Sequence, residues 1–136
     1  MRVGVARSDP QGVLAVPEAT LRRDGALVPD LVRLCAEIEA VVVYVGLPLT
    51  LAGEHGVAAR DAESVASALA AGTVVPVRLV DERLTTVTAQ QVLRDAGRSS
   101  RQSRDVIDQA AAVAILEHAL AAERASGNLA GRAVTV

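Results

Sequence analysis

Two carboxylates stand where an apolar run of the chain ends, and they could hold a metal ion. Asp81 and Glu82 follow directly on a run that predicts a buried strand. Neighbouring side chains of a strand point to opposite faces, so only one of the two faces a given site. Mg²⁺ binds carboxylate oxygens on a rigid element and keeps several waters. The alternative is a solvated strand end, with Arg78 or Arg83 as ion-pair partner.

Asp108 is the second candidate, because it lies early in the most apolar predicted helix of the chain. At helical spacing it shares a stripe with Ala112, Ile115 and Ala119, a face that should pack inward. A carboxylate on that stripe needs a partner or a metal ion, since burying a lone charge is costly. The alternative is a first-turn aspartate favoured by the helix dipole, with Asp105 as the N-cap.

A cluster of arginines leads into Asp108 and could bind phosphates. Arginine holds phosphate oxygens through two parallel hydrogen bonds. Asp95 and Asp105 dilute the positive charge, so a solvated loop at residues 98–104 is the alternative. The members of the cluster are Arg94, Arg98, Arg101 and Arg104.

The remaining reactive side chains favour no other chemistry. His55 and His118 lack a second His or Cys at zinc-ligand spacing. Cys35 lies on the apolar stripe of a predicted helix, which favours a core position over a nucleophile. The sequence contains neither a Walker phosphate-binding loop nor a dinucleotide-binding fingerprint.

The predicted elements that position these residues follow the order β-β-α-β-α-β-α-α. A hairpin followed by βαβ units indicates an α/β fold whose mixed sheet has an antiparallel edge. Ligands of such sheets lie beyond the carboxyl ends of the parallel strands, here residues 46–48 and 81–82. The strands are expected at 2–7, 13–21, 40–45 and 74–80. The helices are expected at 27–38, at 57–71, from a cap at Thr86 or Thr88 to Ala96, and at 105–124.

Composition indicates one globular domain. The 136 residues are 51% hydrophobic and 22% charged, which is close to the average of soluble proteins. We expect a domain at 1–124 and a flexible tail at 125–136. The chain shows no secretion signal and no apolar run long enough to span a bilayer, so we expect a cytoplasmic protein. The net charge of −2 argues against a constitutive nucleic-acid binder but allows an enzyme with a local basic patch.

Several short motifs, in this order, resemble the YqgF/RuvX family over about residues 1 to 122. The most specific is Asp81-Glu82-Arg83-Leu84-Thr85-Thr86, followed at family spacing by Ile107-Asp108-Gln109-Ala110-Ala111. The others are Val3-Gly4-Val5-Ala6, Ser8-Asp9-Pro10, Pro17 with Thr20, and Gly46-Leu47-Pro48 with Gly53 and Gly56.

The resemblance implies an RNase H-like fold, a mixed sheet flanked by helices, related to Holliday junction resolvases. It also implies a metal-dependent nuclease that matures the 5′ end of pre-16S rRNA. The family's metal-binding carboxylates correspond to Glu82 and Asp108, with Mg²⁺ or Mn²⁺ as the cation. Structured RNA is the expected substrate and branched DNA the second choice, bound by a monomer or homodimer.

The sequence departs from the family at its start. Family members carry a Gly-x-Asp-x-Gly strand just before the segment that is here residues 2–6. We therefore expect that the central first strand and its catalytic Asp are missing, that the true start lies upstream of Met1, and that the chain as given is inactive and marginally stable. The alternative function is a non-catalytic RNase H-like module that binds nucleic acid or a ribosome-assembly partner, or a Holliday junction resolvase.

Overall fold

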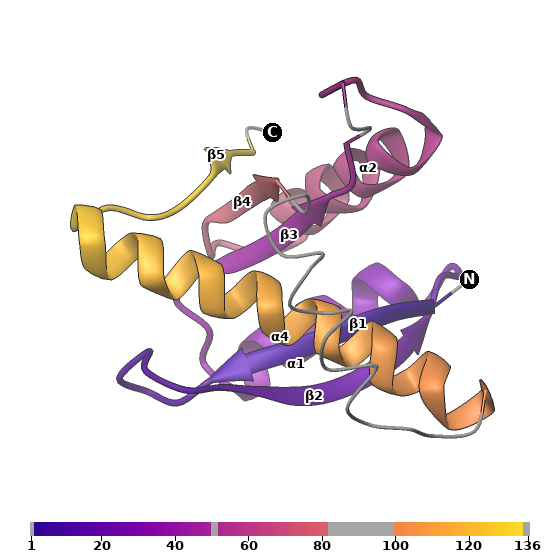
Figure 1. Ribbon diagram of the computed structural model, residues 1–136, viewed down its shortest axis with the longest axis horizontal. Helices are drawn as coiled ribbons and strands as arrows, with labels where there is room; N and C mark the ends of the chain where they lie inside the picture. The colour runs from indigo at the N-terminus through magenta and orange to yellow at the C-terminus, as the bar shows by residue number, and fades with distance from the viewer. Residues whose placement is uncertain (1, 50–51, 82–99, 135–136) are drawn as a thin grey trace. The chain divides into compact units, whose positions relative to one another are not determined.

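The computed structural model describes residues 2–49, 52–81 and 100–134, with side chains in the last segment described from Ile107 onward (Figure 1). Strands and helices alternate along these residues, which confirms the α/β fold class. The elements are β1 (Arg2–Ser8), β2 (Ala15–Arg22), α1 (Leu27–Glu37), β3 (Val43–Leu47), α2 (Val57–Gly72), β4 (Val77–Asp81), α4 (Ser100–Ser126) and β5 (Arg132–Ala133).

The chain divides into two compact units. The first contains Met1–Arg23 and Leu84–Leu129, and the second contains Asp24–Arg83 and Ala130–Val136. The described strands form two sheets, β1-β2 and β3-β4-β5, where the sequence predicted one. The mixed sheet does have an antiparallel edge, but this edge is β5 and not the hairpin.

In the first unit, α4 packs along the β1-β2 hairpin (Figure 1). The strands pair antiparallel, with an irregularity between Val5 and Ala6. The predicted inward stripe of α4 is confirmed at Ile115 and Ala119, which are both buried. Small side chains let the helix lie close to the strands. Among the described residues of this unit, the buried hydrophobic ones are Ala15, Ala110, Ala114, Ile115, Ala119 and Leu120.

The helix α4 begins earlier than the sequence predicted. Ser100 is its first residue, so Arg101 and Arg104 belong to a helix and not to a polar loop. Asp105 is therefore not its N-cap, and Asp108 lies beyond the first turn. The polar start of α4 shows no apolar periodicity, so the sequence pattern predicts the helix only further along. Within the described residues, no helix is both long and apolar enough to cross a membrane.

Asp9 organises the turn between β1 and β2. Its Oδ1 accepts hydrogen bonds from the backbone N–H groups of Val13, at 2.7 Å, and Leu14, at 2.8 Å. Gly12 has a φ of 69°, a left-handed conformation that glycine adopts without a steric penalty. The bonds from Leu14 and Val13 favour the charged carboxylate and hold the pKa of Asp9 below its ordinary value of 3.8.

Asp9→Asn is expected to lower the thermal unfolding midpoint at pH 7, because the amide keeps an acceptor oxygen but loses the charge. A lowered folded pKa stabilises the protein above the unfolded pKa, near 3.8, and this contribution is lost as the pH falls through the lower folded value. The difference in thermal unfolding midpoint between the wild type and Asp9→Asn should therefore disappear below about pH 4. Thermal melts from pH 7 to pH 3 measure this difference. A difference that stays constant with pH contradicts this role of the charge.

In the second unit, β3 and β4 are parallel, and α2 packs against both strands (Figure 1). The carboxyl ends of the two strands meet, because Gly46 pairs with Val80 and Leu47 with Asp81. The apolar face of α2 packs on β3 and β4 through Ala59, Ala66 and Leu69. The buried core consists of Leu47, Ala59, Ala66, Leu69, Val77 and Leu79.

The short strand β5 is fastened to β4 by side chains of the sheet. Arg78 donates from Nε to the Ala130 carbonyl and from Nη2 to the Gly131 carbonyl. The Tyr44 hydroxyl accepts a hydrogen bond from the Ala130 N–H at 3.3 Å. A Cβ added to Gly131 would lie 2.1 Å from the Leu79 carbonyl oxygen. The backbone of Gly131 has a φ of 71°. The segment predicted as a tail thus contains a paired strand, one too short to give a periodic signal.

Candidate active site

Asp108 is held over β1 by a close approach of two backbones. A Cβ added to Gly4 would lie 1.9 Å from the Asp108 carbonyl oxygen and 3.0 Å from the Gln109 nitrogen. Only glycine leaves room for this contact, since real Cβ atoms do not approach backbone atoms under 3.0 Å. Glycine within a strand often marks such an approach. The helix turn that carries Asp108 therefore lies directly against β1.

A side-chain hydrogen bond ties the next residue of α4 to the other strand. Gln109 donates from Nε2 to the Thr20 hydroxyl oxygen at 3.1 Å, and both residues are half-buried. With the contact at Gly4, this bond restricts both the distance and the rotation of α4 over the hairpin. The backbone at Asp108 is therefore held in place by α4, by β1 and by the bond to Thr20.

The carboxylate of Asp108 has an arginine beside it. Arg2 Nε lies 3.7 Å from Asp108 Oδ2, and the side chains are 35% and 28% exposed. This distance exceeds hydrogen-bond length, so the contact is an ion pair within reach of solvent. The expectation that Asp108 needs a partner is thus met by Arg2. No periodic pattern could have identified Arg2, because the contact joins residues far apart in the sequence.

The side chains of most other predicted site residues lie outside the described part of the structure. Glu82, Arg94 and Arg98 lie outside the described residues. Arg101 and Arg104 lie in the first turns of α4, where side chains are not described.

Asp81 is half-buried at the carboxyl end of β4, in the unit that does not contain Asp108. Its place beside Leu47 agrees with the predicted position at the carboxyl edge of the parallel strands.

The donor chemistry at Asp108 suits a hard divalent cation. Mg²⁺ is held by one or two carboxylates together with water and substrate phosphates, so a single well-placed aspartate can contribute to such a site. Within the described segments, no three His, Cys, Asp or Glu side chains gather as a ready-made metal site.

His55 contacts Glu63 through Nδ1, and burial raises the pKa of the half-buried Cys35 thiol.

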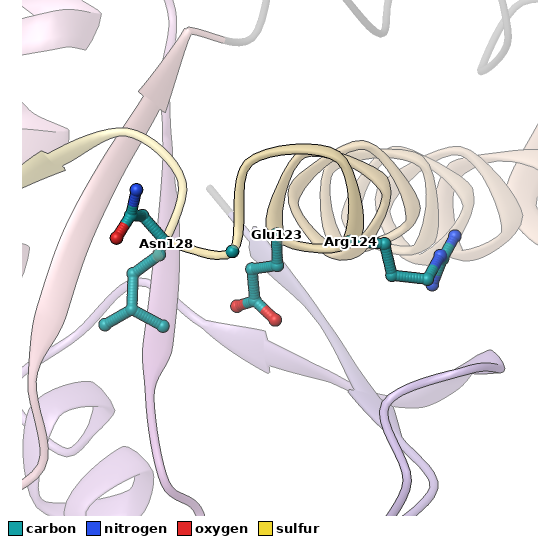
Figure 2. A pocket seen from close by; sticks show the side chains of 5 residues that line it. Glu123, Arg124 and Asn128 are labelled. Carbon is teal, nitrogen blue, oxygen red and sulfur yellow. The ribbon is translucent and has the colours of Figure 1, made fainter.

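A shallow pocket of about 500 Å³ lies at the carboxyl end of α4 (Figure 2). From Asp108 to Glu123 the helix runs about four turns, or roughly 22 Å. The pocket is therefore separate from the candidate site. Its lining residues are Glu123, Arg124, Gly127, Asn128 and Leu129.

The fold and site describe an α/β protein with a rigidly held, solvent-accessible carboxylate on a helix that packs on an antiparallel hairpin. The profile of the RuvX family, described as "Holliday junction resolvase", matches residues 1–122. The chain belongs to this family, which confirms the resemblance seen in its motifs.

Similar proteins carry the name "Putative pre-16S rRNA nuclease". One from Clavibacter michiganensis subsp. michiganensis is 52% identical over 136 residues, which cover 98% of this chain and 84% of the relative. One from Nocardioides sp. is 50% identical over 139 residues, 98% of this chain and 89% of the relative. One from Mycobacterium bovis is 56% identical over 119 residues, 85% of this chain and 70% of the relative.

Proposed function

We propose that this protein is a metal-dependent nuclease that hydrolyses phosphodiester bonds at the 5′ end of pre-16S rRNA in the cytoplasm. Membership of the RuvX family and the names of its relatives support a nuclease role. The observation that carries the assignment of the site is the placement of Asp108. Its helix turn lies against Gly4, while its carboxylate stays partly open to solvent beside a basic group.

Asp108 and Glu82 are the proposed cation ligands, with Mg²⁺ or Mn²⁺ as the ion. When bound, such a cation supplies the activation of water and the charge stabilisation that phosphodiester hydrolysis requires. The contribution of the chain is to hold the Asp108 carboxylate in a fixed place, with the Arg2 guanidinium 3.7 Å away.

Arginines before and at the start of α4 are proposed to bind substrate phosphates. Replacing Arg98 and Arg101 together by Gln should lower the slope of log K against log salt by about two, since each lost phosphate contact removes about one. The control replaces two exposed arginines elsewhere, Arg60 and Arg132, and should leave the slope unchanged. Fluorescence anisotropy with a pre-16S RNA fragment measures the salt slope of RNA binding for the wild type, the Arg98 and Arg101 variant, and the control. Equal slopes in these three proteins would show that the arginine cluster does not contact the RNA.

A second candidate substrate is branched DNA, because the family itself is described as a Holliday junction resolvase. The deciding experiment incubates the protein and Mg²⁺ with a pre-16S RNA 5′ fragment and, separately, with a four-way DNA junction. We expect cleavage of the RNA at the mature 5′ end and an intact junction. Cleavage of the junction alone would assign a resolvase, and binding without cleavage of either would indicate the non-catalytic module.

A further inference from the structure

Arg2 and Arg7 lie on the same strand, and each forms an ion pair with a carboxylate. Arg7 Nε lies 3.3 Å from Glu18 Oε2, so this pair joins neighbouring strands of the hairpin. Arg2 instead reaches α4, where its Nε is 3.7 Å from Asp108 Oδ2. The two arginines stand at opposite ends of β1, roughly 17 Å apart along the strand. Of these two ion pairs, the one formed by Arg2 includes Asp108, the proposed cation ligand.

The contact of Arg2 with Asp108 is weak and accessible. At 3.7 Å it is a charge interaction and not a hydrogen bond, and about a third of the Arg2 side chain is exposed. Pairs of this kind contribute little to stability, because water screens the charges. A phosphate offers a guanidinium two parallel, charge-assisted hydrogen bonds, which are stronger than a single long contact. A nucleic-acid phosphate at this surface would therefore compete successfully for Arg2.

We propose that Arg2 is an exchangeable counter-ion of Asp108. In the free protein its guanidinium lies beside the carboxylate. When nucleic acid binds, the guanidinium transfers to a backbone phosphate, and a positive charge that competes with a divalent cation for the carboxylate is removed. The inference rests on the proposed function for the identity of the substrate, and it makes Arg2 a positioning residue that couples the binding of substrate to the binding of the cation.

The exchange predicts two opposite effects of neutralising Arg2. Arg2→Gln removes a phosphate contact, so the slope of log K against log salt for RNA binding falls by about one. The same change removes the positive charge that competes for Asp108, so Mn²⁺ binds about two- to fivefold more tightly in the absence of RNA. Arg7→Gln removes an equal charge from the same strand and should change neither quantity.

Both effects are measured without cleavage. RNA binding is followed by anisotropy with a pre-16S 5′ fragment in EDTA, and Mn²⁺ binding by calorimetry on the protein alone. Arg2→Met, which keeps the aliphatic stem of the side chain, is the second neutral variant, and circular dichroism verifies the fold of each protein.

The expected pattern is a lower salt slope and tighter Mn²⁺ binding in both Arg2 variants, with wild-type values for Arg7→Gln. Equal slopes for Arg2→Gln and Arg7→Gln, or Mn²⁺ affinity that is unchanged or lower in the Arg2 variants, would overturn the exchange. In an Asp108→Asn background, Arg2→Gln should no longer change Mn²⁺ affinity. A wild-type protein that binds RNA with this pattern but never cleaves it would refute the proposed nuclease and leave the exchange standing.

Discussion

Asp108→Asn is expected to lower the rate of RNA cleavage by about 10²- to 10³-fold or more, the range found when one electrostatic contributor to a transition state is removed. Asparagine has the shape of aspartate, so the contact of α4 with Gly4 and the bond from Gln109 to Thr20 should persist. The ion pair with Arg2 is lost, and an accessible pair of this kind contributes about 0–1 kcal/mol. The variant should thus fold normally and fail in catalysis.

The matched control for this variant is Glu117→Gln. Glu117 is an exposed carboxylate of the same helix, and the change removes the same charge. The Glu117→Gln variant should cleave the RNA at the wild-type rate. Cleavage rates under single-turnover conditions, together with thermal melts, separate catalysis from folding. Wild-type turnover by Asp108→Asn would remove this residue from the mechanism.

Glu82→Gln is expected to have an effect of similar size, and Asp81→Asn a much smaller one. Neighbouring side chains at a strand end point to opposite faces, so only one of the two carboxylates can serve the site. Glu82 lies outside the described residues, and this expectation therefore rests on the motif.

Gly4→Ala is expected to destabilise the protein by about 1–3 kcal/mol or more, the usual cost of forcing extra atoms into a packed site. A Cβ at this position would lie 1.9 Å from the Asp108 carbonyl oxygen, and a backbone atom cannot swing aside as a side chain can. The helix must shift away from β1 and carry Asp108 with it. The variant should therefore lose cleavage as well as stability.

Gly25→Ala is the control, because a Cβ there would meet no atom within 4 Å. Urea unfolding of the three proteins gives their free energies of unfolding, and we expect Gly25→Ala to match the wild type. If Gly4→Ala is as stable as the control, the close approach of β1 and α4 is not a feature of the folded protein.

The sequence was sufficient to predict the fold class and most elements, because apolar periodicity is a local signal. It placed Asp108 on a stripe with Ile115 and Ala119, and both of these are buried. It missed the first turns of α4, since Ser100 to Arg104 carry polar side chains that are compatible with either a helix or a loop. It also missed β5, which pairs only two residues with β4.

The partners of Asp108 were beyond the reach of sequence patterns. Arg2 and Gly4 are about a hundred residues distant from it in the chain, and no spacing rule connects them. A glycine between two valines in a strand was a visible sign of a close approach, although the element that approaches could not be named. The link from Gln109 to Thr20 joins two positions that the family motifs had already marked, and the structure supplies their physical role.

Cleavage of pre-16S rRNA at its 5′ end through a cation held at Asp108 is the function proposed above, and any cleavage by this 136-residue chain would overturn the expectation that the chain is inactive. The most direct test maps the 5′ ends produced from a pre-16S RNA fragment by the wild type and by Asp108→Asn, each with Mg²⁺ and with EDTA. The mature 5′ end is expected only with the wild type in Mg²⁺. The mature end appearing with Asp108→Asn, or with the wild type in EDTA, would contradict it.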